Sequence, residues 1–327
     1  MTTDTYAAAA AVELGAPIGS RRRFLLRVDA HEVGAAIEVP VHVMAGASPK
    51  PRIALVAGVH GDEYDGIVAL PRFLAELEPA TLTGTVVVIT PANPSAFGAG
   101  QRPTPIDGVD LNRVFPGRPD GGVTERLAHM LLHGVLRHVD LVFTMHGARS
   151  VNLLRPWIEF LDEPGPVGQA SLAAAVASGF SDLIANKRKP GHLLGSLAEL
   201  GVPVIEAEVG GRGEVSEPNI RFYMDRLRAL LHHCGILNSG AGDIATKRPS
   251  IWRSNDVFAQ SPGVLVREIE LGDRVGKGQR LARILDSVGR DAADVVSPVD
   301  GTVGLLRFHA GVRPGDMLAR IWAPLPE

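Results

Sequence analysis

The sequence lacks three features that would assign it quickly to a class of protein. It has one cysteine, Cys234, so no disulfide can form within the chain, and we expect this residue to fill space in a helix. Its net charge is −3 and its longest basic block is residues 21–23, which argues against nucleic-acid binding. No run of about 18 apolar residues occurs, so we expect no membrane-spanning helix. What remains is a globular protein of 327 residues, 45% of them hydrophobic.

The N-terminal residues 1–16 also lack the basic start of a secretory signal. An alanine run lies here, but Asp4 and Glu13 interrupt its apolar character. We therefore expect a flexible or loosely docked terminus and a cytoplasmic location.

Between residues 53 and 237, short apolar runs alternate with longer helical patterns, as in α/β proteins. The runs predict strands at 53–57, 86–90, 141–145 and 204–207. The longer patterns predict helices near 66–76, 123–138, 171–178 and 219–233. Upstream, residues 22–27 and 38–43 predict two leading strands that form a hairpin. The expected fold is a mixed sheet flanked by helices.

After Gly240 the pattern changes to short β-rich runs separated by Gly, Pro and Asp, so we predict a catalytic domain at 1–245 and a β-rich domain at 246–327. Within the tail, residues 275–284 can be aligned with 312–321 as a weak internal repeat. Two such copies resemble the halves of a biotinyl/lipoyl-like barrel-sandwich. Lys277 lacks the flanking residues of a modifiable lysine, so we interpret the domain as structural or oligomer-forming.

The segment that carries most chemistry follows the first buried strand and contains His60 and Glu63. A catalytic zinc needs three ligands from His, Asp or Glu and leaves one position for water, whose pKa the metal lowers to about 7. A further ligand is expected at the end of another strand, where His146 precedes a glycine. The sequence thus predicts a metal site made of His60, Glu63 and His146, and this donor set suits zinc.

Two other histidine pairs do not predict a metal site. His129 and His133 have the spacing of a zincin helix, but Met130 stands where that motif needs a glutamate base. We interpret them as part of a helix face. His232 and His233 are interpreted as residues of a helix end, where they interact with the last carbonyls.

A metal-activated water also needs a base that takes its proton and hands it to the leaving amine. Glu206 and Glu208 lie on one face of a predicted strand that runs into a glycine turn. A carboxylate in such an apolar setting is costly unless it is paired or functional, so we expect one of the two to point into the cleft. The residues alone do not decide which.

A long polar segment, residues 93–117, contains turn formers together with apolar residues typical of an ordered binding loop. Arg102 and Arg113 lie in it. Arginines in such a loop suit two functions, stabilising an oxyanion and binding a carboxylate through two hydrogen bonds.

Together these pieces resemble a known family. The motifs His60-Gly61-Asp62-Glu63, Asn93-Pro94, Asp110-Leu111-Asn112-Arg113, His146 and Glu208-Val209-Gly210 occur in the order seen in the succinylglutamate desuccinylase/aspartoacylase family, a branch of the zinc carboxypeptidase-like superfamily. The resemblance covers about residues 20–327. Within the family, residues 61–64 and 112–121 are most similar to bacterial N-acetyl-diaminobutyrate deacetylases.

The resemblance implies a role for each matching residue. His60, Glu63 and His146 would hold one zinc ion, and Glu208 would be the general base and then the acid. Arg102 would stabilise the oxyanion. Asn112 and Arg113 would bind the substrate's α-carboxylate. The chain departs from the family at Thr144, where relatives often have Asp, and at Gly147-Ala148-Arg149, which puts the acyl pocket in question.

The resulting hypothesis is a zinc-dependent amidohydrolase that removes a short N-acyl group from a small amino acid. Its partner would be that small molecule, and the tail is compatible with a homo-oligomer. One alternative is a metallocarboxypeptidase that acts on short peptides, which the tail domain disfavours because it would narrow the cleft. Another is a non-catalytic protein that binds a small ligand, which predicts the loss of a ligand or base that is in fact present.

Overall fold

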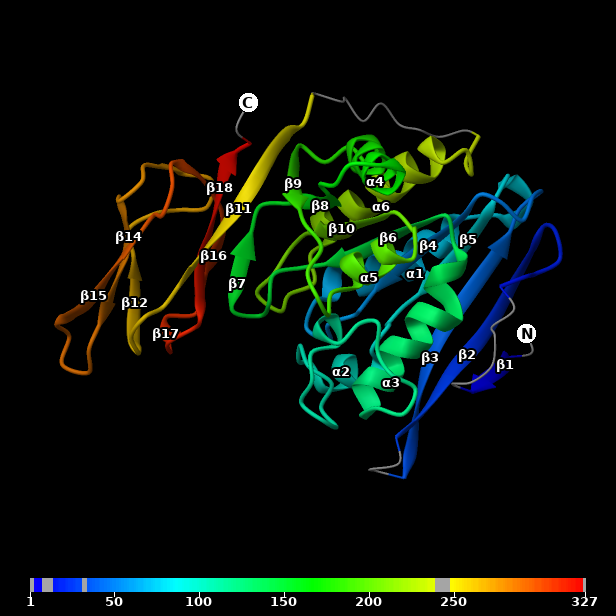
Figure 1. The fold of residues 1–327 in the computed structure, drawn as a ribbon, viewed down its shortest axis with the longest axis horizontal. Coiled ribbons are helices and arrows are strands. Elements are labelled where there is room, and N and C mark those ends of the chain that lie inside the picture. The colour runs from blue at the N-terminus through cyan, green and yellow to red at the C-terminus, as the bar shows by residue number, and fades with distance from the viewer. Residues whose placement is uncertain (1–2, 8–13, 31–33, 239–247, 326–327) are drawn as a thin grey trace.

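The computed structural model describes residues 3–7, 14–30, 34–238 and 248–325 (Figure 1). One large mixed sheet runs through the molecule. In chain order, its strands outside the tail are β1 (Thr3–Ala7), β2 (Ser20–Ala30), β3 (Ala35–Ala45), β4 (Arg52–Ala57), β5 (Thr85–Ile89), β6 (Leu141–His146), β7 (Asn152–Leu154), β8 (Trp157–Leu161), β9 (Asp182–Asn186) and β10 (Val204–Glu208). The strands of the tail, which belong partly to this sheet and partly to a second one, are β11 (Ser250–Phe258), β12 (Gly263–Arg267), β13 (Arg274–Val275), β14 (Arg280–Leu285), β15 (Asp291–Val296), β16 (Gly301–Arg307), β17 (Gly311–Val312) and β18 (Met317–Pro324).

The centre of the sheet is parallel and buried. Strands β5, β4, β6 and β10 lie side by side in this order, and each of the three neighbouring pairs is parallel. Almost all their residues are buried, which explains why they read as continuous apolar runs. All four strands were predicted from those runs. Because they are parallel, their carboxyl ends meet at one edge of the sheet.

Helices cover both faces of the sheet and enclose two apolar cores. On one face lie α1 (Tyr64–Glu76), α4 (Pro166–Ala177) and α6 (Glu217–His233). On the other lie α5 (Leu193–Glu199) and α3 (Val123–His129), which continues as π-helical and 3-10 turns to His138. The predicted helix over 123–138 is therefore present but irregular. Among the described residues, none of the helices combines the length and apolar character that a membrane crossing requires.

The N-terminal strands extend the sheet on one side. Strands β2 and β3 form the predicted antiparallel hairpin, in which Arg23 lies opposite His42. The terminus was expected to be flexible or loosely docked, and residues 3–7 are docked as a strand, since β1 pairs with β2 in parallel. An edge strand is held by backbone hydrogen bonds and needs no apolar pattern, so nothing in residues 3–7 indicates a strand. Residues 1–2 and 8–13 lie outside the described part of the chain.

The tail continues the same sheet instead of standing apart from it. Strand β11 pairs in parallel with β9 and antiparallel with β18, so the order β10-β8-β9-β11-β18-β16 crosses from one part of the chain to the other. A second, antiparallel sheet with the order β15-β14-β12-β17 completes the tail, visible at the left of Figure 1. The predicted boundary at residue 245 lies within residues 239–247, which the structure does not describe.

The internal repeat of the tail corresponds to two copies of one strand arrangement. The first copy is β12, β13 and β14, and the second is β16, β17 and β18. Within each copy the first strand pairs with the third. Across copies, β12 pairs with β17 and β16 pairs with β13. Each copy therefore supplies a short strand that the other copy needs.

Candidate active site

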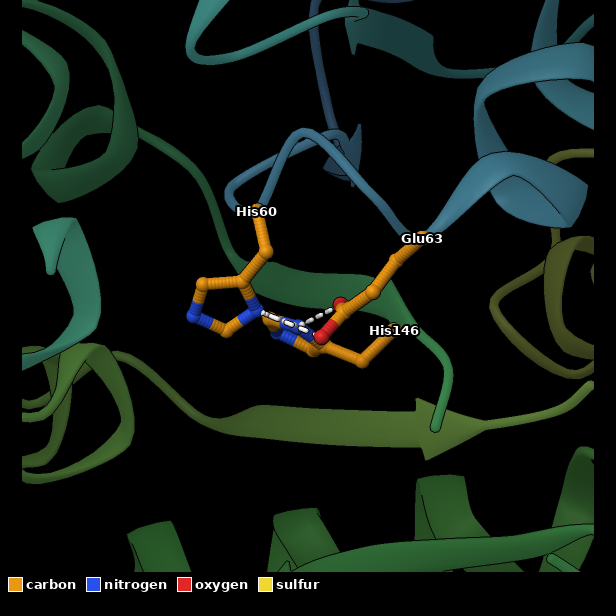
Figure 2. A group of neighbouring side chains, drawn as sticks. All are labelled: His60, Glu63 and His146. Atoms are coloured by element: carbon orange, nitrogen blue, oxygen red, sulfur yellow. Dashed lines mark hydrogen bonds and ion pairs between the residues drawn. The ribbon is translucent and has the colours of Figure 1, made fainter. Parts of the chain in front are cut away.

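Three of the predicted side chains meet at the carboxyl edge of the central strands (Figure 2). His60 and Glu63 lie in the loop after β4, and His146 is the last residue of β6. His60 Nδ1 lies 2.8 Å from Glu63 Oε1, and His146 Nδ1 lies 3.0 Å from Glu63 Oε2. The two Nδ1 atoms are 3.3 Å apart. All three residues are buried, and one donor atom from each lies within 4.8 Å of the others.

The loop after β4 is held by close backbone packing. Gly58 adopts a φ of +75°, a left-handed conformation that favours glycine, and turns the chain out of the strand. A Cβ on Gly61 would stand 2.0 Å from the carbonyl of Ala96 in helix α2 (Pro94–Ala99). The N–H of Gly61 also donates to the carbonyl of Gln101 at 3.1 Å. This packing places His60 and Glu63 on the side of the loop that faces His146.

The charges of this group favour a cation. Burial alone would favour a neutral Glu63, but His60 and His146 hold the pKa of its carboxyl well below the usual range. Burial also favours the neutral form of His146, which lowers its pKa. The hydrogen bond and the charge of Glu63 more than offset this effect and raise the pKa of His146 to about 9. A buried carboxylate between two imidazole nitrogens has the donor set and spacing of a divalent metal site with an open position. The geometry therefore fits the predicted metal.

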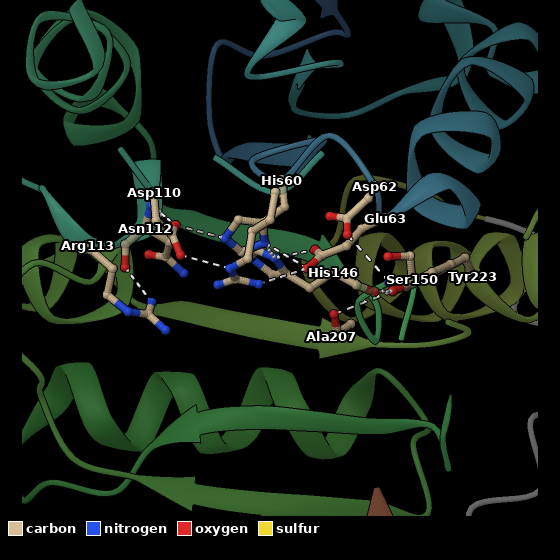
Figure 3. Close-up of polar contacts among 11 residues, drawn as sticks. His60, Asp62, Glu63, Asp110, Asn112, Arg113, His146, Ser150, Ala207 and Tyr223 are labelled. Atoms are coloured by element: carbon tan, nitrogen blue, oxygen red, sulfur yellow. Dashed lines mark hydrogen bonds and ion pairs between the residues drawn. The ribbon is translucent and has the colours of Figure 1, made fainter. Parts of the chain in front are cut away.

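Asp110 supports the group from outside (Figure 3). Its Oδ1 lies 3.2 Å from Nε2 of His60, and its Oδ2 accepts a hydrogen bond of 2.8 Å from Nε of Arg102. Arg102 Nη1 donates to Glu63 Oε1 at 3.2 Å. The pKa of Asp110 is lowered by His60 and Arg102 although burial opposes this. Asp110 thus orients one candidate ligand and one candidate catalytic arginine at once.

Asn112 and Arg113 lie in a short 3-10 turn, Leu111–Arg113, that follows Asp110. The amide oxygen of Asn112 accepts from the N–H of Leu193 at 2.8 Å. Its amide nitrogen is therefore the group left for a ligand. Arg113 donates to the carbonyl of Asn112 and has no acidic partner within ion-pair distance in the described part of the chain.

The two acids of β10 both line the cavity, although one was expected. In the parallel pairing of β10 with β6, Glu206 lies beside Thr144 and Glu208 lies beside His146. Residues two apart on a strand point to the same face, so all four side chains share one side of the sheet. On the other side of β10, strand β8 places Glu159 next to Glu206.

Burial shifts the pKa of both acids upwards. For Glu208, burial and the charge of Glu63 raise the pKa well above the usual range. For Glu206, burial raises the pKa to about 7, against the opposing charge of His146. Carboxyl groups with raised pKa values in a cleft are typical of catalytic sites.

The site opens into one cavity of about 390 Å³. Its walls come from both parts of the chain. The tail contributes Arg320 of β18 and Asp256 of β11, which form an ion pair with a shortest distance of 2.6 Å. Arg320 also reaches Glu159 at 3.4 Å. The further tail residues on the wall are Ser254, Phe258, Leu305 and Met317.

Several residues in or beside the cavity have roles that the sequence did not predict. Asp110 was part of a recognised motif, but nothing local indicated that it would reach His60. Glu159 gave a signal, a lone acid within an apolar run. Arg320 is equivalent in the repeat to Arg283, which pairs with Glu268 at the surface. Only the three-dimensional fold distinguishes these two arginines.

The histidine pairs set aside in the sequence lie away from the cavity. His129 and His133 are neighbours with ring centroids 4.5 Å apart, and neither lines the cavity. His232 and His233 form the last turn of α6. Arg149, the last residue of the segment Gly147-Ala148-Arg149 noted in the sequence, does line the cavity.

A mixed sheet with helices on both faces and a β-rich tail, carrying a buried His–Glu–His group at its carboxyl edge, defines a protein of the zinc carboxypeptidase-like fold class. The model of the succinylglutamate desuccinylase/aspartoacylase catalytic domain matches residues 49–234. The chain belongs to this family.

Individual relatives agree with this assignment. The chain is 30% identical, over 88% of its length and 86% of the relative, to N-alpha-acetyl-L-2,4-diaminobutyric acid deacetylase of Halomonas elongata. It resembles the product-bound structure of the ectoine utilization protein EutE (DoeB) of Ruegeria pomeroyi, with a TM-score of 0.86, 27% identity and coverage of 95% and 97% of the two chains. A succinylglutamate desuccinylase/aspartoacylase of Rhodobacter sphaeroides shares the fold, with a TM-score of 0.85, 24% identity and coverage of 98% and 99%.

Proposed function

We propose that the protein is a zinc-dependent amidohydrolase that removes a short N-acyl group from a small amino acid. The observation that carries this proposal is the buried His60–Glu63–His146 group beside Glu208 in a cavity of small size. Membership in a family of deacylases and the name of the Halomonas elongata relative support it. The reaction consumes one water and releases a carboxylate and a free amine.

The three ligand residues would hold one zinc ion. Zinc in such a site lowers the pKa of a water molecule and polarises the scissile carbonyl. The protein's part is to keep the ligands aligned in a buried site, which Asp110 does for His60 through the 3.2 Å contact.

Glu208 would serve as the general base. It lies on β10 next to His146 on β6, and neighbouring strands are about 4.8 Å apart, so its carboxylate can reach a water beside the ligand group. Its raised pKa suits a group that takes the proton of the attacking water and returns it to the departing nitrogen.

The arginines and Asn112 would recognise the negative charges of the reaction. Arg102 is anchored through Nε and Nη1 by Asp110 and Glu63, which leaves its Nη2 for the oxyanion that develops on the carbonyl. Asn112 and Arg113 offer N–H donors for the substrate's α-carboxylate.

The test is a measurement of amine release from a panel of N-acyl amino acids that includes Nα-acetyl-2,4-diaminobutyrate, with and without a chelator. Metal content is determined for the wild type and for Glu208→Ala. We expect release that depends on the metal, and a loss of about 10²- to 10⁴-fold in the variant with its metal retained.

Release of a C-terminal residue from peptides, without activity on any N-acyl amino acid, would instead establish a carboxypeptidase. Bound metal with no release from either class of substrate would leave a binding protein. An unchanged rate in Glu208→Ala would assign the base to another residue.

A further inference from the structure

A second cavity lies apart from the candidate active site, between helix α1 and the hairpin of β2 and β3 at the right of Figure 1. Its volume is about 430 Å³, and it shares no lining residue with the cavity of the ligand group. The hairpin contributes the floor of this second cavity, and α1 contributes a wall. The proposed reaction makes no use of it.

The register of the strands brings three polar side chains to the same face of this floor. Arg23 of β2 lies opposite His42 of β3, and His42 lies opposite Val88 of β5. Thr90 follows Val88 by two residues, so its side chain points to the same face, diagonal to His42. Diagonal neighbours in a sheet are about 7–8 Å apart, so one small ligand can reach all three side chains.

Thr90 carries a hydroxyl that the fold leaves without a partner. The residue lines the cavity and is 7% exposed. Its Oγ1 atom is buried and has no hydrogen-bond partner among the described residues. A buried hydroxyl without a partner costs free energy, and valine would fill nearly the same space without that cost. A ligand in the cavity would supply the missing partner.

The charges on the floor are positive and incompletely paired. Arg23 is exposed and forms no ion pair within 4.0 Å in the described part of the chain. Arg21, two residues earlier, is held by the carbonyl of Leu77 and lies 3.7 Å from Glu78. Burial and the charges of Arg23 and Arg21 lower the pKa of His42. An anion bound on this floor would therefore relieve an excess of positive charge.

The facing wall is apolar. Helix α1 contributes Pro71, Leu74 and Ala75, and Met44 of β3 adds to the same lining. None of the described residues that line the cavity is acidic. A ligand that fits both sides has an anionic head and a short apolar chain. One guanidinium without an acidic partner balances one negative charge, which favours a carboxylate over a phosphate dianion.

We propose that this cavity is a second binding site, which takes a small monocarboxylate with a short apolar chain. The carboxylate would accept hydrogen bonds from Arg23, His42 and Thr90 Oγ1. The chain would pack against Pro71 and Leu74 of α1. The site depends neither on the candidate metal nor on the proposed reaction.

The experiment uses the full chain and a hexanoate that carries a photoreactive diazirine near the end of its chain, with the labelled peptides identified by mass spectrometry. We expect saturable labelling of residues 71–75, which excess hexanoate suppresses and which hexanol and hexylamine at the same concentration do not. The concentration for half-maximal labelling should rise about tenfold in Arg23→Gln, which loses a charged partner, and about threefold in Thr90→Val, which loses a neutral one.

Arg27→Gln is the matched control, because Arg27 lies on the same face of β2 but outside the cavity, where it pairs with Asp29 at 3.5 Å. Arg113→Gln removes a cation of the other cavity. Both variants should leave the labelling of residues 71–75 unchanged. Melting temperatures verify that each variant is folded, and the exposed Arg23 provides the test if Thr90→Val does not fold.

Three results would overturn the proposal. Labelling that hexanol or hexylamine suppresses as well as hexanoate does would show an apolar groove without selection for an anion. Labelling that is not saturable, or that is the same in Arg23→Gln and Arg27→Gln, would show that Arg23 binds no ligand. Inorganic phosphate that suppresses labelling at a lower concentration than hexanoate would show that the ligand is not a monocarboxylate. None of these readouts uses the deacylase activity.

Discussion

At the scale of single residues, Asp110 is the residue whose change tests the candidate metal site most directly. It contacts His60 Nε2 and Arg102 but is not itself a ligand. We expect Asp110→Asn to weaken zinc binding about 10- to 100-fold, because an amide no longer holds the imidazole in the tautomer and orientation that the metal requires. Competition with a chromophoric chelator measures this affinity.

Asp107→Asn is the control for this prediction, since Asp107 lies in the same loop and caps α3 through the N–H and hydroxyl of Thr124. It should lower the melting temperature and leave the zinc affinity unchanged. Equal zinc affinity in wild type and Asp110→Asn would contradict the role given to Asp110.

A second prediction at this scale concerns the stability of the metal-free protein. Burial raises the pKa of Glu206 to about 7 from 4.5, so the folded state holds its proton more tightly than the unfolded state. Stability contributed by this proton is present below pH 4.5 and is lost as the pH rises to about 7. Glutamine does not ionise, so Glu206→Gln does not lose this stability at high pH. We expect the free energy of unfolding of the variant to exceed that of the wild type by about 2 kcal/mol at pH 8.

At pH 5 the same comparison should show a much smaller gain. Urea unfolding of both proteins at the two pH values provides the measurement. A gain that is the same at pH 5 and pH 8 would mean that the carboxyl group does not titrate in this range in the folded protein.

The residues of the site differ in how far the sequence predicts them. His60, Glu63 and His146 follow strands that read as buried, so their meeting at one edge could be predicted from the parallel order alone. Glu159 and Arg320 could not be predicted as partners, because 161 positions separate them and their contact depends on a pairing of strands across the whole sheet. The sequence around Glu159 and Arg320 shows that each is unusual for its position, but it does not show which residue each one contacts.

At the scale of elements, the turn between β4 and α1 depends on Gly61. A Cβ there would stand 2.0 Å from the carbonyl of Ala96, a backbone group that cannot move without displacing α2. We expect Gly61→Ala to lower the free energy of unfolding by about 1–3 kcal/mol and to weaken metal binding, since the loop carries two ligands. Thermal unfolding with and without zinc gives both quantities.

Gly98→Ala is the matched control, because Gly98 lies in α2 itself and a Cβ there meets nothing within 4 Å. It should leave metal binding unchanged and gain up to about 1 kcal/mol from helix propensity. Should Gly61→Ala behave like Gly98→Ala, the close packing of the loop against α2 would not be what positions the ligands.

Elements were predictable where burial alone shapes the sequence pattern. The central strands and the amphipathic helices α1 and α6 follow from their apolar periodicity. Strand β9 was not predicted, although it is buried, because its five residues are too few to show a clear pattern. Strand β1 escaped prediction because its edge position imposes no apolar pattern. Short elements carry too few residues for a period to show.

At the scale of the whole molecule, the continuous sheet predicts one cooperative unit. The aromatic cluster of Trp157 and Trp322, with centroids 5.6 Å apart, spans the junction of the tail with the remaining chain, and both residues are at most 1% exposed. We expect a single unfolding transition for the full chain, with tryptophan fluorescence and circular dichroism changing together.

A chain that ends at residue 245 would expose Trp157 and the edge of β9, so it should aggregate or bind a hydrophobic dye and unfold without cooperativity. The truncated chain's unfolding curve is the measurement. Two separate transitions in the full chain, or a truncated chain that unfolds cooperatively, would show that the junction contributes little and that the tail is an independent domain.

Strand β18 lies inside the large sheet between β11 and β16, yet it follows all of the other strands along the chain. It also carries Arg320, which closes the cavity wall beside Glu159. Because the sheet is expected to fold as one cooperative unit, a chain under synthesis cannot hold a stable ligand group or a complete cavity while β18 is still inside the ribosome. The last strand to be made therefore sets the earliest moment at which the candidate site can exist.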